Sequence, residues 1–442
     1  MSTVDLSILK PPFVLGAGTS AYQIEGAVTQ GGRGPSIWDS FTHTPGATKD
    51  GSDGDVACDH YNRMAQDVAL LKSLKLDGYR FSIAWPRIIP GGTGQVNGDG
   101  LDFYDRLIDT LLENGIQPYP TLYHWDLPAA LQAGGGWLNR DTVHAFETYA
   151  VTVARRLGDR VPMWLTHNEP WCQAFLAYEI GIFAPGHKNF KEALLCAHHL
   201  LLSHGLATRA LRGEVKTPIG PALNFTPAYP GSDSEADILA ARRQNGYFNG
   251  WFLDPITGRG YPEHMVRYYG DLMPVFPSTD MDIIAAPIDV LGVNYYERSL
   301  VAHSDTDEGV LKLTHLDRPG PATADREIYP QGLSDVLRDL HHNYGLKNLV
   351  VTENGAAFHE QPDATGFVDD RGRADFIRVH LEEVARVKAE GVPVNGYFAW
   401  TLMDNFEWNE GYTIRYGICH TDRTTLKRTP KASALFLKSL RE

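Results

Sequence analysis

The sequence is poor in cysteine. Its 442 residues include only Cys58, Cys172, Cys196 and Cys419, and no two of them form a Cys-x-x-Cys pair. A disulfide framework or a structural zinc site needs cysteines grouped at short, regular spacing. We therefore expect four reduced thiols in structural roles. We single out Cys172 because it lies only two residues after Pro170.

The sequence also lacks long apolar runs and an excess of basic residues. No window approaches the roughly 18 apolar residues of a membrane-spanning helix, and residues 1–12 show no secretory pattern. Lys and Arg number 40 against 54 Asp and Glu, which gives a net charge of -14. Nucleic acids and anionic membranes bind basic surfaces. We expect a cytoplasmic protein with a neutral small-molecule substrate and neither kind of partner, and a homo-oligomer is compatible with the sequence.

Eight short strand-like runs recur along the chain, and stretches with apolar residues at helical spacing separate them. One such stretch carries Val143, Phe146, Ala150, Val153 and Leu157 on a single helical face. The alternation predicts one (β/α)8 TIM barrel over residues 1–442, with long loops at the C-terminal face of its strands; a doubly wound sheet is the weaker alternative. The predicted strands are Phe13–Ala17, Gly78–Ile83, Gln117–Leu122, Val161–Thr166, Pro218–Phe225, Val290–Tyr296, Leu349–Thr352 and Val394–Trp400.

The first predicted strand contains a partial match to a dinucleotide-binding motif. Gly16, Gly18 and Ala21 fit its spacing, and Asp39 follows about twenty residues after the first glycine. The motif requires a helix next, whereas glycines and a proline crowd residues 26–35 and predict no helix there. The histidine pairs on predicted helices have no acidic residue at metal-ligand spacing. We therefore expect neither a nucleotide cofactor nor a bound metal.

Two glutamates stand at the ends of predicted strands. Glu353 directly follows the run Leu349–Thr352, and Glu169 follows the run Val161–Thr166 after two polar residues. The strands of a parallel barrel all end at one face of the fold. Two carboxyl groups that are distant in the sequence are therefore expected to meet at that face.

Polar and aromatic side chains gather at the other strand ends. Sugars need hydrogen-bonding groups for their hydroxyls and flat aromatic faces for their C–H surface. Hydrolysis of a glycosidic bond needs one carboxylic acid and one carboxylate, about 5 Å apart in a retaining enzyme. The pattern predicts an enzyme that acts on carbohydrate. The side chains are Gln23, Glu25, Arg80, His124, Trp125, Asp126, Asn168, Asn294, Tyr296, Trp400, Glu407 and Trp408.

Several short motifs carry a resemblance to a known family. They read Gln-Ile-Glu-Gly at 23–26, Tyr-His-Trp-Asp at 123–126, Asn-Glu-Pro at 168–170, Thr-Glu-Asn-Gly at 352–355 and Asn-Phe-Glu-Trp at 405–408. In these motifs the sequence resembles the family 1 glycoside hydrolases, the retaining β-glucosidases and β-galactosidases. The resemblance implies hydrolysis of terminal β-D-glucosidic bonds in β-glucosides and cello-oligosaccharides through a covalent glycosyl-enzyme intermediate. It adds β-galactosides and β-fucosides as further candidate substrates.

The resemblance also implies residue roles. Glu169 would be the general acid/base and Glu353 the nucleophile, with Arg80 beside the nucleophile. Asn294 would lie near the acid, and Tyr296 would donate a hydrogen bond to the nucleophile. Because strand neighbours alternate, the residue between these last two should face outward. The residues expected to bind the sugar are Gln23, His124, Trp125, Asn168, Trp400, Glu407 and Trp408.

The sequence departs from the family pattern at Arg326, where many relatives have a tryptophan that forms a platform for the aglycone. An arginine can stack or donate hydrogen bonds to a second sugar, and Trp171, Cys172 and Phe175 are further aglycone candidates. One alternative is a 6-phospho-β-glucosidase, which Glu407 disfavours because a carboxylate repels a phosphate. The other is a sugar-binding barrel without catalysis, which the presence of both acids disfavours.

Overall fold

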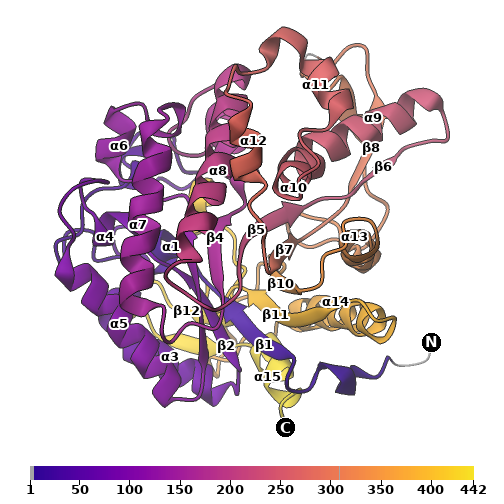
Figure 1. The fold of residues 1–442 in the computed structure, drawn as a ribbon. Coiled ribbons are helices and arrows are strands. Elements are labelled where there is room, and N and C mark those ends of the chain that lie inside the picture. The colour runs from indigo at the N-terminus through magenta and orange to yellow at the C-terminus, as the bar shows by residue number, and fades with distance from the viewer. Residues whose placement is uncertain (1–3, 308) are drawn as a thin grey trace.

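Eight parallel strands close into a barrel in the computed structural model, which describes residues 4–307 and 309–442. Their order around the barrel is β1-β11-β10-β7-β5-β4-β3-β2, with helices outside (Figure 1). Each predicted strand is present, with ends displaced by at most three residues, and the predicted (β/α)8 barrel is confirmed. The barrel strands are β1 (Val14–Gly18), β2 (Gly78–Ser82), β3 (Gln117–Tyr123), β4 (Trp164–Asn168), β5 (Ile219–Phe225), β7 (Leu291–Tyr295), β10 (Leu349–Asn354) and β11 (Val394–Trp400).

The helices pack apolar faces on the barrel. The five apolar residues predicted to share one face of the helix near residue 150 are all fully buried on α7.

No helix within the described ranges is both long enough and apolar enough to cross a membrane. The α-helices are α1 (Ala21–Ile24), α2 (Ile37–Thr42), α3 (His60–Ser73), α4 (Trp85–Ile88), α5 (Gly98–Glu113), α6 (Ala129–Ala133), α7 (Asp141–Leu157), α8 (Phe190–Leu211), α9 (Glu235–Asn245), α10 (Trp251–Ile256), α11 (Glu263–Tyr269), α12 (Thr279–Ile284), α13 (Pro330–His342), α14 (Arg371–Ala389) and α15 (Ala432–Ser439).

Short helical and extended segments complete the fold. The insertions after β5 and β7 contribute α9 to α12 and a small sheet in the order β6-β8-β9, at the upper right of Figure 1. The 3-10 segments are η1 (Leu6–Leu9), η2 (Gly136–Leu138), η5 (Gly270–Leu272) and η6 (Trp408–Glu410); η3 (Cys172–Ile180) and η4 (Gly246–Gly250) are π-helical. The remaining strands are β6 (Ala228–Pro230), β8 (Ser299–His303), β9 (Leu313–His315), β12 (Cys419–Thr421) and β13 (Arg428–Pro430).

One expectation for the first loop needs correction. Residues 26–35 form no helix, as predicted, but the single turn α1 follows β1 directly. All four of its residues are buried. Four residues make one turn, and the dinucleotide motif needs a full helix whose N-terminus faces the phosphates. A nucleotide site at this loop is therefore still not predicted.

The barrel interior and the helix layer bury alternate residues of each strand. On β10, Val351 packs into the main core against the helices, whereas Val350 belongs to a separate apolar cluster with side chains from neighbouring strands. This period of two is that of a regular strand. The separate cluster fills the barrel and consists of Tyr119, Met163, Leu165, Ala222, Val290, Val350 and Phe398.

Irregular pairing at the tips of two strands redirects the residues that follow. The register of β10 shifts after Val351 against both of its neighbours, and that of β4 shifts between Leu165 and Asn168. Such bulges add a residue to one strand and turn the next side chain to a different face. The two candidate glutamates stand at these shifted tips.

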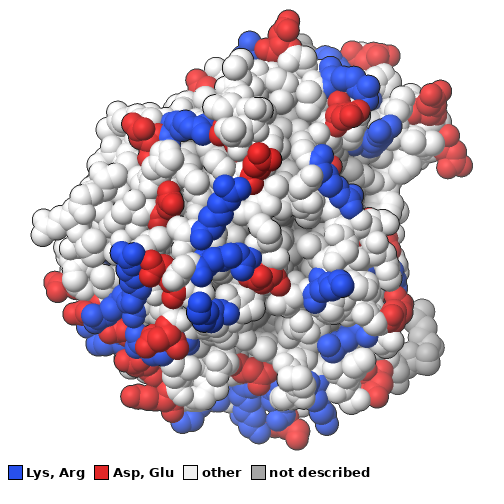
Figure 2. Space-filling model, viewed as in Figure 1, with Lys and Arg blue, Asp and Glu red and all other residues white. Residues whose placement is uncertain are grey.

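The surface carries a mixture of charges. On the face shown in Figure 2, acidic and basic side chains are interspersed among uncharged ones, and no broad basic area is visible. The overall excess is acidic, at -14. This face therefore offers no basic patch for a nucleic-acid backbone.

Candidate active site

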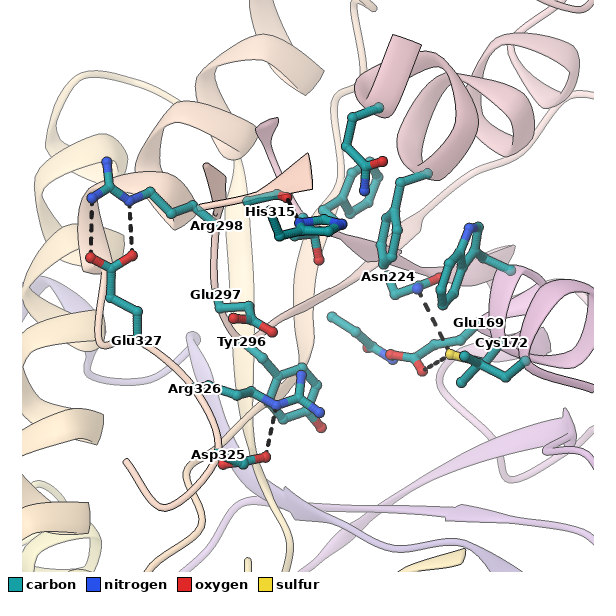
Figure 3. A pocket seen from close by; sticks show the side chains of 18 of the residues that line it. Glu169, Cys172, Asn224, Tyr296, Glu297, Arg298, His315, Asp325, Arg326 and Glu327 are labelled. Atoms are coloured by element: carbon teal, nitrogen blue, oxygen red, sulfur yellow. Dashed lines mark hydrogen bonds and ion pairs between the residues drawn. The ribbon is translucent and has the colours of Figure 1, made fainter. Parts of the chain in front are cut away.

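A cavity of about 1210 Å³ opens at the C-terminal ends of the barrel strands. Both Glu169 and Glu353 line it. Side chains from the insertions line it too, among them His315 and Arg326 (Figure 3). Each of the two glutamates is nearly buried, with 7% and 3% of its surface exposed. The barrel therefore brings together the two strand-end acids predicted from the sequence.

Glu353 lies at the tip of β10 and is held at both carboxylate oxygens. Arg80 from β2 donates from Nη1 to Oε1 at 2.6 Å, and the hydroxyl of Tyr296 donates to Oε2 at 2.7 Å. The Arg80 side chain is 0% exposed and that of Glu353 is 4% exposed, so this ion pair is almost entirely shielded from bulk water. Tyr295, between Asn294 and Tyr296, points the other way, and its hydroxyl donates to the Tyr329 carbonyl. The outward orientation predicted for it is confirmed.

Glu169 follows the tip of β4 and accepts from neutral donors. Asn294 donates from Nδ2 to Oε1 at 2.9 Å, and the thiol of Cys172 donates to Oε2 at 3.1 Å. Burial and, second to it, the charge of Glu353 raise the pKa of Glu169 to about 7. A neutral carboxylic acid is therefore available here below that pH.

A chain of short hydrogen bonds joins the two glutamates. Asn168 accepts at Oδ1 from Nη2 of Arg80 at 2.6 Å and from Nδ2 of Asn294 at 3.0 Å. The same two donors reach Glu353 and Glu169 with their other N–H groups. The two carboxyl groups are thus linked through three fixed side chains, which belong to β2, β4 and β7.

His124 and Trp400 form one wall of the cavity. The rings of the two residues stack with centroids 5.7 Å apart and planes 15° apart. His124 Nε2 accepts from Asn168 at 3.1 Å, which places its proton on Nδ1, and Nδ1 meets no partner within the described part of the chain. Burial, aided by the charge of Arg80, holds the pKa of His124 well below its usual range. The neutral ring is left with one free donor.

Glu407 and Trp408 lie in the segment that follows β11, the strand that ends at Trp400, and the Trp408 ring also stacks on His124. Gln23 donates from Nε2 to Glu407 at 3.1 Å and to the Phe406 carbonyl at 2.9 Å, and its own side chain lies behind the cavity wall. Burial raises the pKa of Glu407 to about 8. Trp408 packs on Trp125 at 4.7 Å between ring centroids. Five of the seven predicted sugar-binding residues line the cavity, namely His124, Trp125, Trp400, Glu407 and Trp408. Gln23 and Asn168 are buried behind the wall, as is Arg80.

Comparison with known proteins identifies the family. The family model described as "Glycosyl hydrolase family 1" matches residues 7–442. A β-glucosidase from Agrobacterium sp. is 44% identical over 97% of this chain and 94% of its own length. A 1,4-β-D-glucan glucohydrolase from Thermotoga neapolitana is 42% identical over 97% of both chains. The structure of a family 1 β-glucosidase from Thermotoga maritima superposes with a TM-score of 0.95 at 42% identity, covering 98% of this chain and 97% of that one. The chain belongs to glycosyl hydrolase family 1.

The outer part of the cavity of this family 1 protein contains three of the four predicted aglycone residues. Trp171, Cys172 and Arg326 line it. Phe175 does not, because its side chain is fully buried and packs against Tyr247 with ring centroids 4.4 Å apart. It supports the wall rather than facing the cavity, since η3 turns it toward the core.

Arg326 reaches toward the catalytic centre. Its Nε donates to Asp325 at 3.0 Å, and its guanidinium lies 4.7 Å from the ring centre of Tyr296 (Figure 3). Asp325 also accepts from the hydroxyls of Tyr416 and Thr323. Within residues 4–307 and 309–442, the two Nη groups of Arg326 meet no acceptor. These donors remain available to a ligand.

Sequence reasoning missed several residues in this outer part. Asn224 on β5 lines the cavity and donates to Cys172, and Phe248 and His315 add to the wall from insertions. Asn224 is a polar residue near the end of a predicted strand, the same signal that identified the other site residues. Phe248 and His315 carry no such signal, because insertion geometry decides where they lie.

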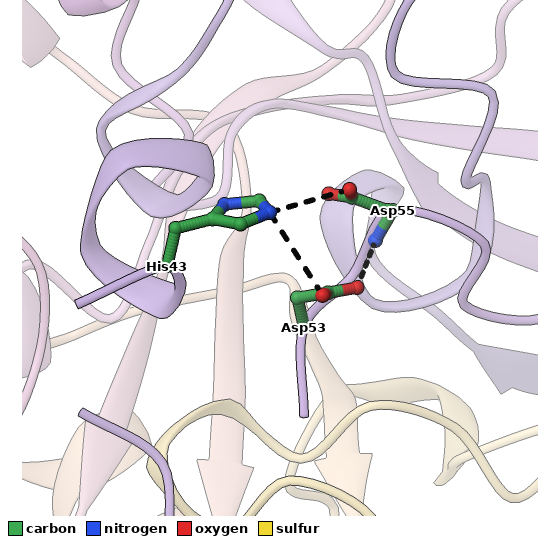
Figure 4. A group of neighbouring side chains, drawn as sticks. All are labelled: His43, Asp53 and Asp55. Carbon is green, nitrogen blue, oxygen red and sulfur yellow. Dashed lines mark hydrogen bonds and ion pairs between the residues drawn. The ribbon is translucent and has the colours of Figure 1, made fainter. Parts of the chain in front are cut away.

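One cluster outside the cavity has the composition of a metal site. Among the described residues it consists of His43, Asp53 and Asp55 (Figure 4). His43 Nδ1 donates to the Asp39 carbonyl at 2.5 Å, and Nε2 lies 3.3 Å from an oxygen of Asp55. The carbonyl and, to a lesser degree, the two carboxylates raise the pKa of His43. When it is protonated, the imidazole pairs with the two carboxylates as in an ordinary ion pair.

Proposed function

We propose that this family 1 protein is a retaining β-glucosidase that releases terminal β-D-glucose from β-glucosides and cello-oligosaccharides. The relatives named β-glucosidase and 1,4-β-D-glucan glucohydrolase support this substrate class. The single observation that carries the proposal is the pair of enclosed carboxyl groups, one ion-paired and one held by neutral donors. β-Galactosides and β-fucosides are proposed as further substrates.

The two carboxyl groups divide the chemistry between them. An oxygen of Glu353 attacks the anomeric carbon while Glu169 transfers its proton to the departing glycosidic oxygen, which leaves a glycosyl ester. Glu169, now an anion, then takes a proton from a water whose oxygen attacks the same carbon. The ester bond breaks and returns Glu353 as a carboxylate. A pKa of Glu169 near 7 suits both roles, because it holds a proton first and loses it readily once the charge of Glu353 is gone.

The neighbouring side chains are proposed to orient the sugar. The free Nδ1–H of His124 and the Glu407 carboxyl group are placed to bond ring hydroxyls, and Trp400 offers its face to the C–H surface. Asn168 lies just behind the wall, and we assign the amide hydrogen that is left after its bond to His124 to the 2-hydroxyl of the sugar. Trp125 donates to the Asn168 carbonyl at 2.8 Å and keeps this residue in place.

The aglycone site is proposed to favour hydroxylated aglycones. The free Nη donors of Arg326 suit the oxygens of a second sugar, and Trp171 supplies an apolar face next to them. The ion pair with Asp325 offsets the charge of Arg326, so the site does not require an anionic aglycone. The cavity of about 1210 Å³ exceeds the roughly 300–1,000 Å³ of ordinary ligand pockets, which leaves room for an oligosaccharide.

Cellular setting and domain organisation are part of the proposal. All four cysteines are free and buried, which supports a reducing compartment such as the cytoplasm. We propose that residues 1–442 form one catalytic domain, because the family match spans residues 7–442. Neither the 6-phospho-β-glucosidase nor the non-catalytic alternative finds support in the comparisons.

Product stereochemistry and covalent trapping test the proposal together. When the purified protein acts on cellobiose, proton NMR should show that glucose is released first as the β-anomer. A 2-deoxy-2-fluoro-glucoside with a good leaving group should label Glu353, located by peptide mass spectrometry. Release of the α-anomer first, or a label on another residue, would refute the mechanism. A cellobiose 6-phosphate analogue cleaved in preference to cellobiose would favour the phosphorylated-sugar alternative instead.

A further inference from the structure

The thiol of Cys172 occupies an unusual place next to the acid/base. Its Sγ lies 3.1 Å from Oε2 of Glu169, and its backbone N–H donates to the Glu169 carbonyl at 2.9 Å. The residue begins η3, the helical segment that follows β4. Only 8% of Cys172 is exposed, so this contact is shielded from bulk water. The mechanism described above makes no use of this group.

Asn224 sets the direction of the thiol hydrogen bond. Its Nδ2 lies 3.8 Å from the sulfur of Cys172, and an amide N–H can only donate. The sulfur accepts on that side and keeps its own hydrogen for Glu169. On the other carboxyl oxygen of Glu169, the Asn294 amide likewise only donates. Each oxygen of the acid/base therefore receives one hydrogen from a neutral group.

Hydrogen bonds of this kind stabilise the charged form of a carboxyl group and fix its plane. We propose that Cys172 is a positioning residue, which orients the Glu169 carboxyl group and supports its anionic form by a thiol hydrogen bond. This inference rests on the proposed function of Glu169. It extends that function to the second half-reaction, in which Glu169 must be an anion to accept the proton of water. The ester bond to Glu353 breaks in the same step.

Ionisable groups from three further elements also face Glu169. Glu353 on β10 opposes ionisation of Glu169, and Arg326 from the loop after β9 favours it. Tyr296, after β7, is uncharged because burial and the two nearby glutamates hold its pKa well above the usual value. Burial and the charge of Glu169 likewise raise the pKa of Cys172, so the thiol keeps its hydrogen.

Two substitutions separate the hydrogen bond from the volume of the side chain. Cys172→Ala removes the donor, and Cys172→Ser replaces it with a hydroxyl donor of similar size. Cys196→Ala on α8 is the matched control, since that thiol is also fully buried but packs in the core. All three proteins are compared by thermal melting before their kinetics are measured.

The alkaline limb of the pH profile of kcat/KM is the main readout. In Cys172→Ala this limb should move to higher pH by about half to one unit. Removal of the thiol hydrogen bond destabilises the anion of Glu169, so the pKa of Glu169 rises. The kcat for an activated aryl β-glucoside, limited by hydrolysis of the ester, should fall by about three- to tenfold as the carboxyl group loses one of its two orienting bonds. Cys172→Ser should restore the alkaline limb to within about 0.3 pH unit of the wild type and kcat to within about twofold.

Three results would overturn the inference: an unmoved limb in Cys172→Ala, a Cys172→Ser protein that behaves like it, or an equal shift in Cys196→Ala. Each of these leaves the proposed function standing, provided the wild type releases β-glucose. A wild type without turnover on any β-glucoside would instead refute the proposed function itself.

Discussion

The two glutamates differ because their surroundings differ. Glu353 faces the guanidinium of Arg80, whereas Glu169 accepts from an amide and a thiol within the described part of the chain. A cation favours the carboxylate form, whereas burial and the charge of Glu353 raise the pKa of Glu169 and favour a retained proton there. The same residue type thus serves as nucleophile at one position and as acid at the other.

Substitution of the nucleophile has separate effects on rate and stability. We expect Glu353→Gln and Glu353→Ala each to lower kcat by about 10⁴-fold or more, because no covalent intermediate forms. The alanine protein should also be less stable, because Arg80, which is fully buried, loses its ionic partner. Steady-state kinetics and thermal melting measure the two effects. Near-normal turnover in either protein would end the nucleophile assignment.

Substitution of the acid should depend on the leaving group. Glu169→Gln keeps the shape and the bond from Asn294 but cannot donate a proton to the departing oxygen. Rates of glycosylation on cellobiose should fall by about 10²- to 10⁴-fold, while activated aryl glucosides should lose far less. Comparison of kcat/KM for the two substrates gives the answer. Equal losses would contradict the acid role.

The pH dependence of the wild type follows from the same residue. Glu169 must carry its proton to assist departure of the leaving group, and its pKa is raised to about 7. The kcat/KM for cellobiose should therefore decline as the pH rises through about 7. Glu169→Gln supplies the control, because its profile should lack this alkaline limb. A wild-type profile that stays flat to pH 9 would contradict the assignment.

At the level of elements, the shape of a strand tip decides which way the catalytic side chain points. On a regular strand Glu353 would share a face with Val351, which packs outward into the helix layer. The register shift after Val351 turns Glu353 into the cavity instead. The shifted end of β10 pairs with the end of β11, where Asn354 lies opposite Ala399. The site therefore requires that these two strand ends stay close together.

Gly355 tests this close approach. A Cβ atom at this position would collide with the backbone carbonyl of Trp400 at the end of β11. Gly355→Ala should force the two tips apart, lower the free energy of unfolding by about 1–3 kcal/mol and reduce kcat/KM at least tenfold. Gly98→Ala is the matched control, because a Cβ there meets open space. An active and stable Gly355→Ala protein would show that the tips tolerate movement.

At the level of the whole molecule, the barrel closes between its first and last strands. β1 pairs with β11 in an unbroken register from Val14 opposite Gly396 to Gly18 opposite Trp400. Near the chain's C-terminus, Arg441 joins the segment before β1 to the residue before β2. It donates to Asp77 at 2.6 Å and to the Leu9 and Phe13 carbonyls at 2.9 Å. Both ends of the sequence are thereby tied together beneath the barrel.

Removal of this tie should affect stability without affecting catalysis. Arg441→Ala breaks bonds that are largely enclosed, since the Arg441 side chain is 7% exposed. The free energy of unfolding should fall by about 1–3 kcal/mol, seen as a lower Tm, while kcat and its pH profile stay unchanged. Arg371→Ala removes an ion pair with Asp369 in which the Arg371 side chain is 84% exposed, and it should change stability by less than about 1 kcal/mol. An equal effect of both changes would rule out a special role for Arg441.

The sequence by itself determined the element types, the closed barrel and the positions of the two acids. Strand and helix periods depend on neighbours within a few residues, and the Asn-Glu-Pro and Thr-Glu-Asn-Gly motifs are just as local. Predictions for the outer cavity were less complete, because Phe175 was expected there and Asn224 was not.

Only the tertiary structure decided how those residues act. The bulge that turns Glu353 inward, the bond from Asn224 to Cys172 and the free donors of Arg326 all depend on contacts between distant segments. The pKa of Glu169 depends first on burial by the assembled barrel, which no local pattern records. Local pattern specified which groups are present, and packing specified their direction, partners and charge.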